Sequence, residues 1–219
     1  HEPLYKETIT HLLEWKKGKY TDEEMKQILE LRDWRLGLEA ESSHFMHYFV
    51  SLIEDIFENV KFIMTIREPL GWIESEFGQN MITRKMEYWK KLEQFRYNKY
   101  NNKYENSKIK ESENLYPIKS YLDYWVEHTC YVDKVIEKNN LKKINTYDIN
   151  ESKKKLEKIC GVKIKIKEKV HSNEGGKRKE IYNYVSREKL IRRIKKHKCI
   201  DIIQKRFPCL IKDMKYFSL

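Results

Sequence analysis

The chain has few of the residues that build tight turns, cross-links and membrane spans. It contains 7 Gly, 4 Pro and 4 Cys in 219 residues, and the cysteines show no Cys-x-x-Cys spacing. This pattern argues against a zinc site, and a chain of this length needs no disulfide framework, so we expect reduced thiols. No stretch approaches the roughly 20 apolar residues that span a bilayer, and no signal-peptide pattern is present. We therefore expect no membrane span and a cytoplasmic protein.

Charged residues, in contrast, are abundant and unevenly distributed. They make up 36% of the chain, whose formal net charge is +11. Residues 151–219 hold 22 Lys and Arg against 8 Asp and Glu, whereas residues 1–150 hold 23 against 26. A basic C-terminal part on a near-neutral body favours an anionic ligand, a nucleic acid or a membrane surface as partner. A solvated, lysine-rich surface without a partner is the alternative.

Helix and strand patterns alternate along the chain. We expect helices over residues 4–17, 21–34, 44–57, 70–95, 118–138, 150–160 and 186–198, and strands over 36–40, 60–66, 142–149 and 162–167. Thr21 and Ser186 are predicted helix caps, and the long helix is expected to break near Gly78. The apolar run 60–66 suits a strand covered on both faces, and the polar segment 97–117 is typical of a long loop. The sequence thus predicts one domain, 1–219, with an α/β fold and a parallel sheet.

One corner of this fold has the residues of an anion site. Arg67 ends the best predicted strand, and Ser75 lies eight positions later in the helix that follows. In open α/β sheets, ligands bind beyond the carboxyl ends of the strands. An arginine offers a planar, bidentate grip and a serine adds a hydroxyl donor, which together suit a phosphate. The alternative is that Arg67 pairs with Glu68 or Glu74 and that Ser75 is an ordinary surface residue.

The stretch around this corner, KFIMTIREPLGWIES, resembles the 3′-phosphate-binding motif of the sulfotransferase family, in which a strand ends in Arg, an acidic residue and Pro. LIEDIFENVKFI is similar to the family's preceding helix and turn, and LKKINTYDINESKKKLEKICGV to a later strand, turn and helix. HSNEGGKRKE falls where members carry a basic, Gly-containing loop over the 3′-phosphate of 3′-phosphoadenosine-5′-phosphosulfate (PAPS). The resemblance runs from about His1 to Ile181 and is to bacterial and tyrosylprotein-type members.

The resemblance implies a three-layer α/β fold, with a central parallel sheet flanked by helices, similar to P-loop NTPases. It implies PAPS as the donor, adenosine 3′,5′-bisphosphate (PAP) as the product, and in-line sulfuryl transfer to a hydroxyl or amine without a metal. The acceptor would be a small molecule, a carbohydrate or a peptide. The family's first strand and Gly-rich phosphosulfate loop are not found here, because no Gly-x-x-x-x-Gly-Lys stretch occurs, so we expect them to precede His1.

Residue by residue, the resemblance gives Arg67 and Ser75 to the 3′-phosphate of the nucleotide. Three basic residues would cover the same end of it: Lys177, Arg178 and Lys179. One departure from the family pattern is that Glu180, rather than Gly, follows them. The geometry by which this loop closes is therefore left open.

The catalytic base is expected on the acceptor side. Glu2 matches the carboxylate that serves as base in tyrosylprotein-type members and is our leading assignment, although a frayed terminal carboxylate is the alternative. Glu41 and His44, which follow a predicted strand, are the other possibilities, because cytosolic members place a histidine there. For His44 the simpler interpretation is a residue at the start of a helix.

Two other functions stay open at this stage. The first is a non-catalytic module that binds RNA or another polyanion through residues 151–219, because phosphate contacts dominate such affinity. Its basic residues fall in several elements without a recognised RNA-binding motif, which makes nucleic acid the less favoured partner. The second is a nucleotide kinase-like relative of the P-loop enzymes, which would also need a phosphate-binding loop ahead of this chain.

Overall fold

The computed structural model describes residues 2–83, 86–101, 116–136, 140–146, 149, 152–164 and 180–206. Within them the protein is mostly helical, with one small parallel sheet. The α-helices are α1 (Tyr5–Lys16), α2 (Asp22–Leu36), α3 (Val50–Ile56), α4 (Pro69–Thr83), α5 (Glu87–Asn101), α7 (Ile118–Val135), α8 (Lys153–Cys160), α9 (Arg187–Lys195) and α10 (Cys199–Arg206). Two short 3₁₀ helices, η1 (Met46–Phe49) and η3 (Glu180–Asn183), complete them, and the strands are β1 (Phe62–Ile66) and β2 (Leu141–Asn145). An α/β class is confirmed at this coarse level.

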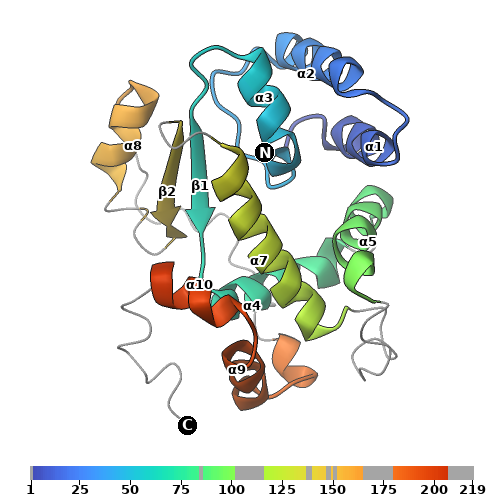
Figure 1. Ribbon diagram of the computed structural model, residues 1–219, viewed down its shortest axis with the longest axis vertical. Coiled ribbons are helices and arrows are strands. Elements are labelled where there is room, and N and C mark those ends of the chain that lie inside the picture. Colours follow the sequence, from blue (N-terminus) through green and yellow to red (C-terminus); the bar gives the residue numbers. More distant parts are fainter. Residues whose placement is uncertain are drawn as a thin grey trace.

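The sheet pairs β1 with β2 in parallel, from Phe62 opposite Leu141 to Ile66 opposite Asn145. Asn140 fixes the start of the pair, because its carbonyl accepts from the Phe62 N–H at 2.9 Å. Both strands therefore end at the same edge of the sheet, and in Figure 1 their arrowheads point toward α4 and α10 and away from α2 and α3. Residues that directly follow β1 and β2 accordingly lie on the side of α4.

Strand β1 is covered on one face only by the described part of the chain. Met64 and Ile66 are buried in the core, whereas Ile63 is 38% exposed and Thr65 is exposed as well. The prediction of a strand covered on both faces is therefore wrong for the described residues. Side chains of β1 alternate between the core, where α4 and α7 pack, and an exposed face, and a continuous apolar run does not show this alternation.

The N-terminal helices form a cluster of their own. Thr21 caps α2 in a capping box, since its hydroxyl accepts from the Glu24 N–H while the Glu24 carboxylate accepts from the Thr21 N–H at 2.8 Å. The second cap, Ser186, accepts from the Lys189 N–H at the start of α9. Both predicted caps are confirmed. The buried residues of this N-terminal cluster come from α1, α2, η1, α3 and α5 and from Phe45: Ile9, Leu12, Met25, Leu29, Phe45, Phe49, Leu52 and Leu92.

A second and larger cluster joins both strands and α3, α4, α5, α7, η3, α9 and α10 around the buried aromatic residues Phe77, Tyr97, Tyr121 and Trp125. Helix α7 crosses the middle of the molecule diagonally, between α1–α3 and the C-terminal helices (Figure 1). Basic helix α9 buries Leu190, Ile191 and Ile194 in this cluster and turns its charged side outward. Among the described residues, no helix is both long and apolar enough to cross a bilayer.

Several predicted boundaries are corrected. Residues 36–40 are not a strand: Leu36 ends α2, Gly37 takes a left-handed backbone (φ 55°) that terminates the helix, and Leu38 is 45% exposed. Residues 162–164, the described part of another predicted strand, form none either. Helix α4 runs without a break through Gly78, and α5 extends to Asn101, so helix replaces the first part of the loop predicted from 97. Residues 102–115 lie outside the described residues.

Candidate functional site

The corner after β1 is built by Glu68 and Pro69. Pro69 opens α4, where its missing N–H costs no hydrogen bond. The Glu68 carboxylate accepts from the Leu70 N–H at 2.6 Å and from the Gly71 N–H at 2.7 Å, and thus satisfies two of the free donors at the helix start. Glu68 is buried, with 5% of its surface exposed. Its carboxylate therefore caps α4, a role that the sequence did not suggest.

Arg67 is the last residue before this cap. Its backbone carbonyl accepts from the indole N–H of the buried Trp125 at 3.0 Å, which ties the corner to α7. The guanidinium is partly exposed, and within the described part of the chain it forms no side-chain hydrogen bond or ion pair. The alternative pairing with Glu68 or Glu74 is not observed: Glu68 accepts from backbone amides, and Glu74 accepts from the Tyr182 hydroxyl.

Ser75 lies in the second turn of α4 and is partly exposed. The rise of a helix puts it roughly 9 Å along the axis from Pro69. Its neighbour Glu74 holds η3 against α4 through the hydroxyl of Tyr182. Lys177, Arg178 and Lys179 lie outside the described residues, but Glu180, which directly follows them in the sequence, begins η3. The chain therefore enters η3 beside the Ser75 turn.

The acceptor-side candidates fall into two different arrangements. Glu2 and His44 lie together, with Oε1 of Glu2 2.5 Å from Nδ1 of His44. Glu41 instead forms a bidentate pair with Arg32, at 2.6 and 2.7 Å. This pair joins α2 to the segment before η1, so Glu41 has a structural role, whereas Glu2 and His44 form a carboxylate–imidazole pair.

The electrostatics of this pair keep Glu2 ionised and His44 neutral. Burial opposes ionisation of Glu2, but the hydrogen bond with His44 favours it, and the pKa of Glu2 is lowered overall. Burial and the positive charge of Arg96 lower the pKa of His44. The imidazole stacks on Trp89, with ring centroids 5.2 Å apart, while 46% of its side chain is exposed. A neutral, oriented and accessible imidazole is able to accept a proton.

The residues that surround His44 were not predicted from the sequence. His47 and His128 meet edge to face with ring centroids 4.2 Å apart, and Arg96 lies buried near them. Burial lowers the pKa of His128 to about 4, with Arg96 adding to the effect. These residues come from η1, α5 and α7, so only the tertiary structure brings them together. The His44–His47 spacing of three residues was the single local signal.

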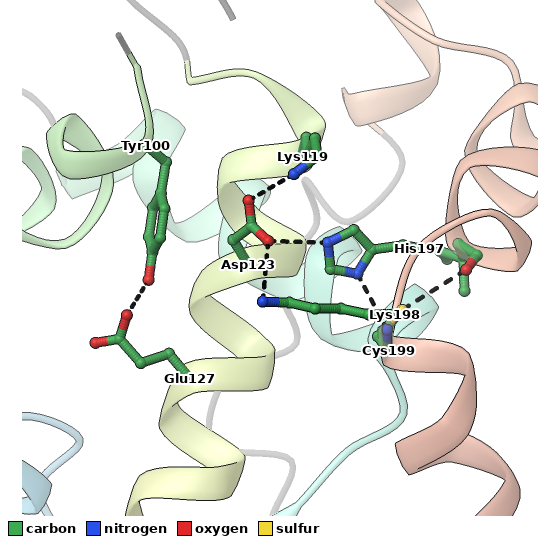
Figure 2. A network of polar contacts seen from close by, with 8 residues as sticks. Tyr100, Lys119, Asp123, Glu127, His197, Lys198 and Cys199 are labelled. Carbon is green, nitrogen blue, oxygen red and sulfur yellow. Dashed lines mark hydrogen bonds and ion pairs between the residues drawn. The ribbon is translucent and has the colours of Figure 1, made fainter. Parts of the chain in front are cut away.

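A second polar network fixes the C-terminal helices to α7 (Figure 2). Asp123 accepts from Nζ of Lys119 at 2.9 Å and contacts Nε2 of His197 at 3.0 Å. Because the Cys199 N–H donates to Nδ1 of His197, the imidazole proton sits on Nε2 and points at Asp123. Burial opposes ionisation of Asp123, but the hydrogen bonds from Lys119 and His197 hold its pKa below the usual value.

The arrangement of Asp123, His197 and Cys199 is structural rather than catalytic. The Cys199 thiol lies 3.7 Å from the Ile194 carbonyl, its sulfur is buried, and burial raises its pKa to about 12. A thiol in that state is not a nucleophile at neutral pH. Cys130 and Cys160 are likewise free thiols. In the described part of the chain, no group of three His, Cys, Asp or Glu side chains is placed to hold a metal ion.

No protein-family model, curated protein or solved structure matches the chain. The functional argument therefore rests on the corner at Arg67, on the Glu2–His44 pair and on the sequence motif around Arg67.

Proposed function

We propose that the protein transfers a sulfuryl group from PAPS to a hydroxyl or amine acceptor. The observation that carries this proposal is the guanidinium of Arg67 at the carboxyl end of β1, partly exposed and without a carboxylate partner among the described residues. Ligands of α/β proteins bind at that edge of the sheet. The Arg67 backbone is held there by its hydrogen bond with Trp125. Its guanidinium can then donate two parallel N–H groups to a phosphate.

The 3′-phosphate is assigned to Arg67 and Ser75. The Tyr182–Glu74 contact supports this assignment, because it holds η3 against the turn of α4 that carries Ser75. The three residues before η3, namely Lys177, Arg178 and Lys179, are proposed to cover the same phosphate. Four cations and a hydroxyl donor around one dianion form a binding set of the kind that phosphate recognition uses.

A larger sheet is part of the proposal. Two strands of five residues make a small sheet, and the face of β1 that carries Ile63 and Thr65 is open in the described part of the chain. A three-layer fold would cover this face and extend the sheet. The reaction also requires a phosphosulfate-binding loop, and no Gly-x-x-x-x-Gly-Lys stretch occurs in this sequence.

On the acceptor side, the proposal assigns the proton to the Glu2–His44 pair. The acceptor oxygen or nitrogen attacks the sulfur as the bond to the 5′-phosphate oxygen breaks, and PAP leaves. Nε2 of His44 takes the acceptor proton, while Glu2 holds Nδ1–H and stabilises the imidazolium that forms. Glu2, our leading base from the sequence, thus becomes the carboxylate that orients the base.

A polyanion-binding module is the second candidate, and the observation that favours it is the basic outer side of α9. Arg192 and Lys196 are exposed there, while the apolar side of the helix is anchored in the core. This function would use the net charge without any nucleotide site. Binding to RNA that weakens steeply with salt, in a protein that shows no affinity for PAP, would favour it over sulfuryl transfer.

Calorimetric titration with PAP tests the assignment. Arg67→Ala removes a bidentate, charge-assisted contact, and we expect the affinity for PAP to fall by about 30-fold or more. Ser75→Ala removes one neutral donor, and we expect a loss of about fivefold to tenfold. Arg35→Ala is the matched control, because Arg35 is an exposed arginine paired with Glu7 on the N-terminal helices. PAP affinity that is indifferent to both site variants would overturn the proposal.

A further inference from the structure

Arg96, on α5, is a buried cation whose hydrogen bonds are incomplete. Only 4% of its side chain is exposed. Nη1 lies 3.7 Å from Oε1 of Glu76, a long ion pair, and Cζ lies 5.4 Å from the centre of the Tyr124 ring. Nε and Nη2 are buried and have no hydrogen-bond partner among the described residues. Buried charged donors are almost always paired, so two open ones on a single guanidinium need an explanation.

Arg32 shows what a fully satisfied arginine looks like in the same protein. It is 8% exposed, and all three of its nitrogens donate. Nε bonds the Thr8 hydroxyl at 3.0 Å, Nη1 bonds Glu41 at 2.6 Å, and Nη2 bonds both Glu41 at 2.7 Å and the Pro3 carbonyl at 3.0 Å. The open donors of Arg96 are therefore specific to its own position.

The two open nitrogens of Arg96 share one edge of the guanidinium. Nε–H and one Nη2–H point in parallel from that edge, at the spacing of the two oxygens of a carboxylate. The nearest acid, Glu76, does not take this edge: it lies on the Nη1 side and accepts from the Tyr97 hydroxyl at 2.7 Å. Among the described residues, this edge of Arg96 therefore offers two parallel N–H donors that no carboxylate accepts.

Arg96 lies near two carboxylates, those of Glu76 and Glu2, and near several neutral rings. Its positive charge acts on three imidazoles, those of His44, His47 and His128, and burial lowers the pKa of each, so that they are neutral near pH 7. All three are exposed or partly exposed, whereas Arg96 is buried. Nε and Nη2 of Arg96 have almost no exposed surface, so a ligand reaches them only when side chains near the histidines move apart.

We propose that the Nε–Nη2 edge of Arg96 binds the carboxylate of a small ligand, in a site bordered by His44, His47 and His128. Glu76 already offsets part of the charge of Arg96, which favours a singly charged, planar anion over a phosphate dianion. A bound carboxylate would satisfy both orphan donors at once. The site uses neither Arg67 nor Ser75.

The anion site itself does not depend on the proposed function, but its assignment to the acceptor does. Glu76 follows Ser75 directly on α4, and Arg96 acts electrostatically on both Glu2 and His44. A carboxylate bound to Arg96 would hold the ligand beside the pair that is proposed to take the acceptor proton. The acceptor class that follows is a hydroxyl or amine compound that also carries a carboxylate.

The test uses acetate as the probe and compares two buried arginines. Thermal unfolding is measured near pH 7 in sodium acetate and in sodium chloride of equal ionic strength. With acetate on the order of 0.1 M and a dissociation constant of about 1 mM, we expect the midpoint to rise by about 5–10 °C in the wild type. Arg96→Lys keeps the charge but loses the fork, so the acetate increment should disappear. Arg32→Lys should lower the midpoint and leave that increment unchanged.

Nitrogen–proton NMR of the arginine Nε–H groups tests the site in the wild-type protein and does not depend on the stability of a variant. In the wild type, the Arg96 Nε–H resonance should shift on addition of acetate, and that of Arg32 should not. An acetate increment that persists in Arg96→Lys, or an Arg96 resonance that acetate does not move, would overturn the site. Binding of acetate without binding of PAP would keep the anion site and remove its assignment to a sulfuryl acceptor.

Discussion

The cap that Glu68 places on α4 supports the corner from which Arg67 projects, and it makes a quantitative prediction. Glu68→Ala removes the acceptor of two backbone N–H groups, those of the buried Leu70 and the part-buried Gly71. Hydrogen bonds to charged groups contribute roughly 1.5–3 kcal/mol each, and the Gly71 N–H can regain water. We therefore expect the free energy of unfolding to fall by about 2–3 kcal/mol, more than the ~1 kcal/mol of an ordinary cap.

Equilibrium unfolding in urea, followed by circular dichroism, measures this change as a lower midpoint at constant slope. Glu68→Gln keeps one acceptor oxygen and loses the charge, so it should cost about half as much. Thr21→Ala is the matched control, because Thr21 caps α2 at an exposed site through a single hydroxyl. If Glu68→Ala costs no more than Thr21→Ala, or Glu68→Gln equals the wild type, the carboxylate does not hold the corner.

Three further outcomes follow from other parts of the structure. Glu41→Gln weakens the part-buried pair with Arg32 and should lower the free energy of unfolding by about 1–3 kcal/mol in the same urea assay. His128 has a folded-state pKa of about 4, so stability should fall as the pH drops from about 6.5 toward 4, by up to about 3 kcal/mol, and His128→Asn should flatten that slope in chloride buffers. Cys199, with a buried thiol of pKa about 12, should alkylate at least about 100-fold more slowly than the exposed Cys160 in mass-spectrometric mapping.

Local patterns predicted those elements whose determinants are local. The caps at Thr21 and Ser186 both lie where the sequence predicts them, because each depends on residues within a few positions. Leu36–Ala40 was predicted as a strand from two leucines, but Gly37 ends a helix there and no strand lies beside it among the described residues. Whether a short apolar run becomes a strand depends on distant pairing partners that a local pattern does not contain.

The candidate site divides in the same way. Arg67 and Ser75 were found because one motif spans both, and Glu2 and His44 because each matched a separate family position. Their contact across 42 residues was not foreseen. Arg96 carried no signal at all, since a lone arginine in an amphipathic helix is usually a solvated residue. Only the tertiary packing of α5 against α4 and α7 shows that it is buried with two donors open.

The central claim is that Arg67 recognises a 3′-phosphate, and the most direct measurement compares two nucleotides that differ only in that group. Calorimetry with PAP and with adenosine 5′-monophosphate gives the contribution of the 3′-phosphate as a ratio of affinities. We predict a preference for PAP of about 30-fold or more in the wild type, reduced to a few-fold in Arg67→Ala. Equal affinity for the two nucleotides in the wild type, or the same preference in the variant, would contradict the account.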